Sequence, residues 1–92
     1  MKVLKHKVFG EFEVTTDIDQ GQLEAWSDYL YNAENDKHGF IYRNRILIEA
    51  AAEAKILLKT KPDWKKESPA LISWLSSEIA TIINEITTTP KN

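Results

Sequence analysis

Apolar and charged residues alternate at the start of the chain, whereas apolar residues farther along recur every three or four positions. In residues 5–14, KHKVFGEFEV, lysines alternate with apolar residues before a glycine, and glutamates alternate with them after it. This period of two predicts a β-hairpin with one charged and one apolar face, because successive side chains of a strand point to opposite faces. We expect a loop at residues 8–10, with Gly10 in the left-handed conformation. The expected cross-strand pairs are Lys7 with Glu11, Lys5 with Glu13, His6 with Phe12, and Leu4 with Val14.

A helical pattern follows in residues 19–34. Asp19 is a favoured N-cap residue, and Gln22 three positions later completes a capping box. The apolar residues that recur at helical spacing are Leu23, Trp26, Leu30 and Ala33. This spacing predicts an amphipathic helix that begins just after its cap.

Two further helices are predicted, at residues 39–59 and 69–87. The first of them is apolar around much of its circumference, which is typical of a central helix with neighbours on several sides. Its apolar positions include Leu47, Ile48, Ala51, Ala54 and Leu58. The second begins after Ser68, a favoured N-cap residue, with Pro69, which is favoured at the first helical position.

The order of these elements predicts the class of fold. A chain of 92 residues is expected to form a single domain, residues 1–92. An isolated two-stranded ribbon is barely stable, so the hairpin, at about residues 2–16, needs a surface that covers its apolar face. We therefore predict an α+β fold in which an N-terminal two-stranded β-hairpin packs on a three-helix unit.

The composition excludes several kinds of protein. The chain has no cysteine, which excludes disulfides, thiolate zinc sites and a cysteine nucleophile and fits a reducing compartment. The first ten residues are too polar for a signal peptide, and the longest apolar run is far shorter than the ~18 residues of a membrane helix. The net charge of −2 provides no overall attraction to nucleic acid. We expect a cytoplasmic protein that binds neither membranes nor nucleic acid.

Candidate catalytic and metal-binding residues are few. Asp17 and Asp19 are spaced like the first ligands of a calcium loop, but the glycine and the final carboxylate of such a loop are misplaced. The two histidines, His6 and His38, do not form a His-x-x-x-His pair, and no serine lies in a Gly-x-Ser-x-Gly motif. A small hydrolase that uses His38 with Asp36 remains an alternative. The sequence favours a non-enzymatic protein, with no catalytic residue, metal or cofactor.

A basic cluster lies between the last two predicted helices. With Trp64 among them, its members are Lys55, Lys59, Lys61, Lys65 and Lys66. Such a cluster can contact phosphates beside a stacking aromatic ring, but lysines after a helix also complement the helix dipole. We favour the second interpretation because the helix at 19–34 is acidic. That acidic helix suggests another alternative, an inhibitor or anti-defence protein that occupies a basic groove.

The last predicted helix and the connector before it are rich in apolar residues for so small a chain. An exposed apolar stripe marks a protein interface, whereas a buried stripe is core, and the pattern alone leaves both open. The candidate protein-interface residues are Trp64, Ile72, Leu75, Ile79, Ile82, Ile83 and Ile86. If they are exposed, we expect a binding or assembly protein that forms homo-oligomers or holds a protein partner.

Several short motifs occur in an order that resembles small phage tail assembly chaperone-type proteins. The matching pieces are Phe9-Gly10, IEAAAEA at 48–54, PDW at 62–64, Pro69, SWL at 73–75, and Pro90. The resemblance implies a non-enzymatic protein that binds the tape measure protein, self-associates, and keeps its partner soluble until the tail tube polymerises. It further implies a location in the cytoplasm of an infected host cell, and no catalytic residues.

Overall fold

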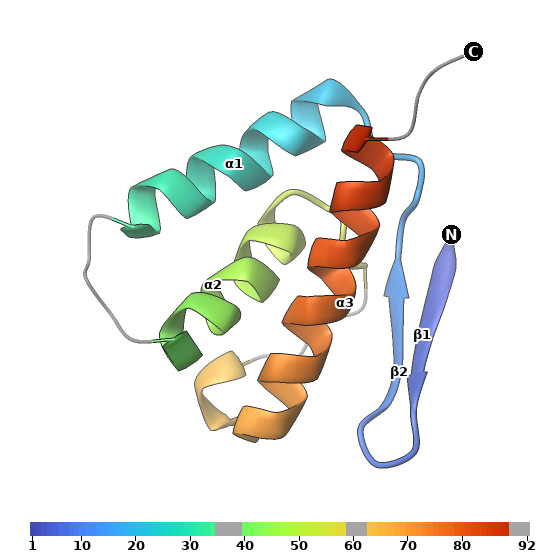
Figure 1. The fold of residues 1–92 in the computed structure, drawn as a ribbon, viewed down its shortest axis with the longest axis vertical. Helices are drawn as coiled ribbons and strands as arrows, with labels where there is room; N and C mark the ends of the chain where they lie inside the picture. Colours follow the sequence, from blue (N-terminus) through green and yellow to red (C-terminus); the bar gives the residue numbers. More distant parts are fainter. Residues whose placement is uncertain (35–39, 59–62, 89–92) are drawn as a thin grey trace.

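The computed structural model describes residues 1–34, 40–58 and 63–88, and these confirm the predicted α+β fold, a hairpin followed by three helices (Figure 1). In chain order, the elements are β1 (Lys2–His6), β2 (Gly10–Val14), α1 (Gln20–Glu34), α2 (Phe40–Glu53), the short 3₁₀ helix η1 (Trp64–Lys66) and α3 (Pro69–Thr88). Helix α2 lies between α1 and α3, and the hairpin runs along the other side of α3 (Figure 1).

The hydrophobic core lies where the hairpin, α2 and α3 meet. Its buried members are Leu4, Phe12, Val14, Ile48, Ala51, Ala54, Ile56, Leu57, Trp64, Leu71, Ile72, Leu75, Ile79, Ile82 and Ile83. The apolar face of the hairpin is therefore covered, as the two-residue pattern requires. Phe12 is buried, and its ring centroid lies 6.1 Å from that of Trp74 on α3.

The register of the hairpin differs from the predicted one by two residues. Lys5 lies opposite Glu11, with an ion pair of 3.7 Å between them, and Leu4 lies opposite Phe12. Gly10 has the expected positive φ, 87°, but it begins β2 after a turn at residues 7–9. The predicted loop and all four predicted pairs are therefore wrong. The assignment of residues to the two faces is right, because a shift by two keeps every side chain on its face.

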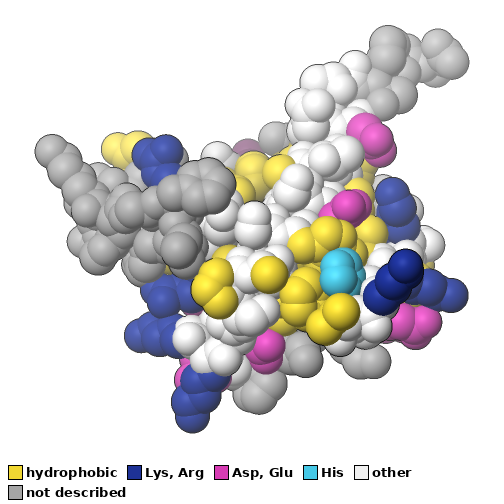
Figure 2. Space-filling view, turned by 60° about the horizontal axis from the view of Figure 1, so that its bottom comes forward, with side chains coloured by type: hydrophobic (Ala, Val, Ile, Leu, Met, Phe, Trp, Pro, Cys, Tyr) yellow, Lys and Arg dark blue, Asp and Glu magenta, His cyan; other side chains and the backbone are white. Residues whose placement is uncertain are grey.

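The side chain of His6 explains why the turn closes where it does. Its Nδ1 atom accepts hydrogen bonds from the backbone N–H groups of Val8, at 3.0 Å, and Phe9, at 3.4 Å. The imidazole also stacks on the Phe9 ring at 4.3 Å and meets the edge of the Trp74 ring at 4.9 Å. Figure 2 shows this end of the molecule, where hydrophobic side chains gather around the histidine. His6 is thus a structural residue that holds the hairpin turn against α3.

Helix α2 ends at Glu53, six residues before the predicted end at residue 59. Lys55 adopts a left-handed φ of 62°, and the N–H groups of Lys55 and Ile56 donate to the carbonyls of Ala52 and Ala51. This pattern is a Schellman motif, in which the left-handed position is usually a glycine.

The chain after α2 then runs beside the free edge of β2. The N–H of Thr15 donates to the carbonyl of Ile56 at 2.9 Å, and the N–H of Leu58 donates to that of Glu13 at 2.8 Å. Leu58 is 46% exposed, so it does not lie on a buried helix face as predicted. Leu47 is half-buried, whereas Ile48 beside it is fully buried, as are Ala50 and Ala51.

The starts of α1 and α3 agree with the sequence predictions. The N–H of Asp19 donates to Gln22 Oε1 at 3.0 Å, and the N–H of Gln22 donates to Asp19 Oδ1 at 2.8 Å, which confirms the capping box. At α3, the N–H of Leu71 donates to Ser68 Oγ at 3.2 Å, which confirms the N-cap. Local side-chain chemistry therefore sets where both helices begin.

Candidate functional site: the groove between α1 and α3

The residues predicted to form a protein interface are core residues. Ile72, Leu75, Ile79, Ile82 and Ile83 are each no more than 4% exposed, and Trp64 is 7% exposed. Ile86 is half-buried and packs against the same core. The sequence left core and interface open, and the structure places most of the stripe in the core, because α3 is covered from two sides, by the hairpin and by α2 (Figure 1). Of these side chains, Ile83 also lines the groove described below.

Helix α1 is attached in a different way. None of its described side chains is fully buried. Its amide side chain Gln22 donates from Nε2 to the carbonyls of Ala54, at 3.3 Å, and Lys55, at 3.4 Å, which lie at the end of α2. Farther along, the hydroxyl of Tyr29 donates to Glu49 Oε2 at 3.1 Å. These polar contacts join α1 to α2, and the half-buried Leu23 and Trp26 add apolar contact with the core.

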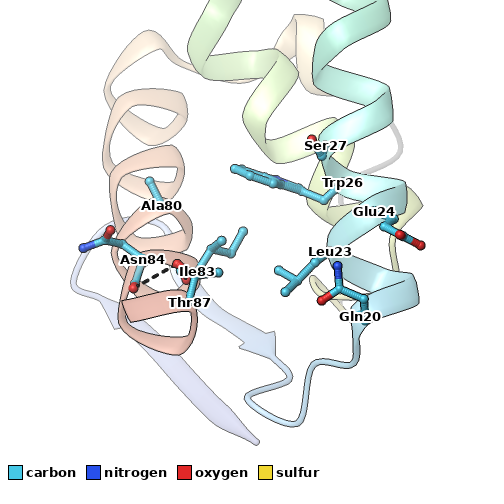
Figure 3. Close-up of a pocket in the computed structure, with 9 residues that line it drawn as sticks. All are labelled: Gln20, Leu23, Glu24, Trp26, Ser27, Ala80, Ile83, Asn84 and Thr87. Atoms are coloured by element: carbon cyan, nitrogen blue, oxygen red, sulfur yellow. Dashed lines mark hydrogen bonds between the residues drawn. The ribbon is translucent and has the colours of Figure 1, made fainter. Parts of the chain in front are cut away.

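A groove of about 610 Å³ separates α1 from α3 (Figure 3). Its apolar lining consists of Leu23 and Trp26 on α1 and of Ala80 and Ile83 on α3. Its polar lining consists of Gln20, Glu24, Ser27, Asn84 and Thr87. These five polar residues are exposed, so the groove has an apolar floor and a polar, solvent-facing rim.

Both walls of the groove present residues at the same helical spacing. On α1 the lining includes positions 20, 23, 24 and 27, and on α3 it consists of positions 80, 83, 84 and 87. Each set follows the i, i+3, i+4, i+7 pattern of one helix face. Figure 3 shows Leu23 near Ile83 and Thr87, and Trp26 level with Ala80, so the two walls run in opposite directions.

The indole of Trp26 is the one chemically unusual feature of this groove. The ring projects from α1 toward α3 (Figure 3), and its Nε1 atom is buried without a hydrogen-bond partner in the described part of the chain. An unpaired buried N–H of this kind costs about 1–3 kcal/mol. A group of this kind is paired by ordered water or by another molecule.

The described residues contain no candidate metal site. No cluster of three or more His, Asp or Glu side chains in residues 1–34, 40–58 and 63–88 is placed to hold a metal ion. Near the groove, the hydroxyl of Thr87 donates to the carbonyls of Ile83 and Asn84, so it is engaged within α3. The suggested pair of Asp36 and His38 lies outside the described residues, and the hydrolase alternative stays a prediction.

The basic cluster does not surround an exposed aromatic ring. Trp64 is buried, which contradicts its use as a stacking platform, while Lys65 and Lys66 are exposed on η1. Lys55 lies just after the C-terminus of α2, where a positive charge complements the helix dipole. Lys59 and Lys61 lie outside the described residues. None of the helices that the structure describes is long and apolar enough to cross a membrane.

Comparison with known proteins finds no matching family model, no similar curated protein and no similar solved structure. The function is therefore inferred from the groove and the residues around it.

Proposed function

We propose that this chain is a non-enzymatic protein-binding domain, an assembly chaperone or adaptor that holds an apolar segment of a partner protein between α1 and α3. The observation that carries this proposal is the groove itself, with apolar side chains on two helices and a polar, exposed rim. Apolar concave surfaces of this kind are preferred binding sites. The unpaired N–H of Trp26 adds a reason for a partner, since an acceptor on that partner would offset the cost of its burial.

The resemblance to phage tail assembly chaperones gives this proposal a specific form. In that form, the partner is the tape measure protein, the chain also associates with itself, and both act in the cytoplasm of the infected cell. The order of the short motifs supports this form, and so does a groove shaped by helix faces, which suits a long helical partner. A neighbouring gene for a long helical protein of the tape measure kind would support it further.

The experiment first finds a partner through the groove and then tests the purified pair. The photo-crosslinker benzoylphenylalanine replaces Ser27, on the rim, in cells that express the chain. The crosslinked protein is purified, and its binding is measured with Ala80→Trp and with Thr81→Trp. Ala80 lines the groove, so its replacement fills the space, whereas Thr81 is exposed and does not line the groove.

We expect Ala80→Trp to weaken binding at least about tenfold, a loss of about 1.4 kcal/mol, and Thr81→Trp to bind like the original chain. Circular dichroism confirms that both variants fold. Equal binding by both variants would contradict the proposal, because the groove would then not be the binding site. The control carries the same bulky side chain, so a general effect of tryptophan is separated from occlusion of the groove.

An inhibitory role is a second candidate, and one observation favours it. The acidic side chains Asp17, Asp19, Glu24 and Asp28 are exposed, and none forms an ion pair with a described Lys or Arg. An acidic row of this kind is suited to a basic groove on a target protein. The double variant Glu24→Gln with Asp28→Asn would then weaken binding of the purified partner much more than Ala80→Trp does. If Ala80→Trp weakens binding more than the double variant does, the result argues against an inhibitory role.

A further inference from the structure

We infer that the occupant of the groove is an amphipathic α-helix of a partner protein, with Lys or Arg residues beside its apolar stripe. This inference rests on the proposed function, because it specifies what the groove between α1 and α3 holds. Three features of the groove support it. The lining residues of both walls have helical spacing, the backbone groups of both walls are paired within their own helices, and the charge around the groove is negative.

The spacing of the walls fits a helix. The lining positions on α1 and on α3 each span two helical turns, about 10 Å along the axis. A helix laid between two such walls meets ridges at the i±3 and i±4 spacing on both sides, which is how helices pack. Helix α2 lies between α1 and α3. A partner helix laid in the groove would therefore complete a four-helix arrangement with α1, α2 and α3 (Figure 1).

An extended segment fits the groove poorly. The lining consists of the side chains of two helices, whose own backbone groups are paired within each helix. A strand laid in the groove would therefore bury N–H and C=O groups without partners, at a cost for each one. A helix brings its backbone hydrogen bonds with it. This difference favours a helical occupant over a strand.

The charge around the groove favours a basic occupant. Neither α1 nor α3 contains Lys or Arg, and together their sequences hold five acidic residues, Glu24, Asp28, Glu34, Glu78 and Glu85. Glu24 lines the groove and is the ionisable residue of its lining, and Asp28 is exposed one turn farther along α1. Positive charge on a partner speeds its association with an acidic surface, and negative charge on a partner opposes binding. Lys and Arg beside the apolar stripe of the occupant supply that charge.

A second copy of this chain does not supply a suitable helix. Helices α1 and α3 are acidic, so either one would bring like charge to the groove. Helix α2 carries Arg43 and Arg45, but Arg45 pairs with Glu49 at 3.3 Å, and Ile48 and Ala51 of this helix are in the core. The complementary helix therefore belongs to a different protein.

An exposed tyrosine lies one turn beyond the groove on α1. Tyr31 is 70% exposed and follows Ser27 by four positions, so it lies on the same edge of the helix as Glu24 and Ser27. Tyrosine is among the residues that contribute most to protein interfaces. An occupant helix that continues one turn beyond the groove meets this side chain, which makes Tyr31→Ala a second probe of the same interface.

The test uses three labelled peptides of about 18 residues, long enough to become helical when bound. The first has leucines at the i, i+3, i+4, i+7 spacing with lysines beside them, and the second has glutamates in place of the lysines. The third has the composition of the first in an order without helical period. Binding is measured by fluorescence anisotropy with the full chain, with Ala80→Trp, with Thr81→Trp, with Tyr31→Ala, and with the double variant Glu24→Lys, Asp28→Lys.

We expect the lysine peptide to bind about tenfold or more tightly than the glutamate peptide, a difference that shrinks as salt screens the charges. The scrambled peptide should not bind, Ala80→Trp should abolish binding, Thr81→Trp should preserve it, and Tyr31→Ala should weaken it. The double lysine variant should reverse the preference between the two peptides. Circular dichroism of every variant separates loss of binding from loss of fold.

Several results would overturn the inference. Equal binding of the scrambled peptide would show that no helix is required, and equal or tighter binding of the glutamate peptide would exclude charge selection. If light scattering shows a dimer that Ala80→Trp abolishes and Thr81→Trp preserves, the occupant is a second copy. In each of these cases the proposed function still stands, because the groove holds a polypeptide. The proposed function itself fails only when Ala80→Trp leaves the purified partner's binding unchanged.

Discussion

Helices α1 and α3 form the two walls of one groove, yet they are held in the molecule by different forces. Seven residues of α3 are buried, all but one of them apolar, and they pack on both the hairpin and α2. Helix α1 has no fully buried side chain among those described and is joined to α2 through Gln22, Tyr29 and two half-buried apolar residues, Leu23 and Trp26. The wall formed by α3 is therefore part of the core, and the wall formed by α1 is a separate piece laid against it.

The difference has an energetic basis. Full burial of one large aliphatic side chain contributes about 1.5–3 kcal/mol, whereas one hydrogen bond contributes about 0.5–1.5 kcal/mol net. Helix α3 therefore contributes far more than α1 to the free energy of folding. It follows that α1 is the wall better able to shift when a partner enters, and that its amide hydrogens should exchange faster than those of α3.

The largest expected effect is at the centre of α3. Ile79→Ala removes a fully buried side chain and should lower the free energy of unfolding by about 2–5 kcal/mol, because the surrounding core closes the cavity only in part. Urea denaturation measures the change. Ile86→Ala, at the half-buried end of the same helix, is the matched control and should cost clearly less. A cost below about 1 kcal/mol for Ile79→Ala would contradict the contrast between the two helices.

A smaller effect is expected where α1 joins α2. Gln22→Ala removes the acceptor for the N–H of Asp19 and the donor to the carbonyls of Ala54 and Lys55. We expect a loss of about 1–2 kcal/mol, together with faster amide exchange in α1 and little change in α3. Gln20→Ala, in the first turn of the same helix and without such bonds, should change stability by less than about 0.5 kcal/mol. If the amide hydrogens of α1 exchange equally fast in the two variants, Gln22 does not anchor the helix.

The end of α2 offers a change in the opposite direction. Lys55→Gly should raise the free energy of unfolding by about 0.5–1 kcal/mol, because glycine adopts the left-handed conformation without the cost that a Cβ atom brings. Lys55→Ala keeps that Cβ atom and removes the charge, so it should not be stabilising. Thermal and urea denaturation measure both variants. If alanine and glycine stabilise equally, charge rather than backbone conformation accounts for the gain.

The smallest expected effect on stability is at Trp26. Trp26→Phe keeps an aromatic ring in the groove and removes the unpaired N–H, so stability should stay the same or rise by up to about 1 kcal/mol. Binding of the purified partner should weaken in the same variant if the partner supplies an acceptor. A loss of stability above about 1 kcal/mol would contradict this prediction.

The features that were predicted correctly depend on neighbouring residues. The capping box of Asp19 and Gln22 and the Ser68-Pro69 start of α3 are local, so they can be read from a few positions of the sequence. The end of α2 is different. Lys55 occupies the left-handed position where a glycine would have indicated the end of the helix. The apolar residues at 56–58 continue the helical spacing, although in the structure they pair with β2.

The sequence could not decide between core and interface for a related reason. A stripe of isoleucines at helical spacing has the same pattern whether it meets the core or a partner, and only the position of the hairpin and α2 shows that Ile79 is core. The hairpin register was missed because two registers put the same residues on the same faces, and His6 selects between them through its turn. The groove was not predicted because its walls come from segments that meet only in space. Ile83 is the candidate interface residue that lines it.

The backbone pairing between β2 and the segment at 56–58 also bears on how the chain folds. It joins Thr15 to Ile56 and Glu13 to Leu58, so the chain leaves the sheet edge, forms α1 and α2, and returns to the same edge. The contacts within the hairpin join residues that are near each other in the sequence, so they form quickly. The pairing of β2 with residues 56–58 must instead overcome the entropy of closing a long loop. We expect the last backbone pairs of the sheet to form late, after the two helices inside the loop have shortened the distance between its ends. The folding rate should then respond more to helix propensity in α2 than to the strength of the hairpin turn.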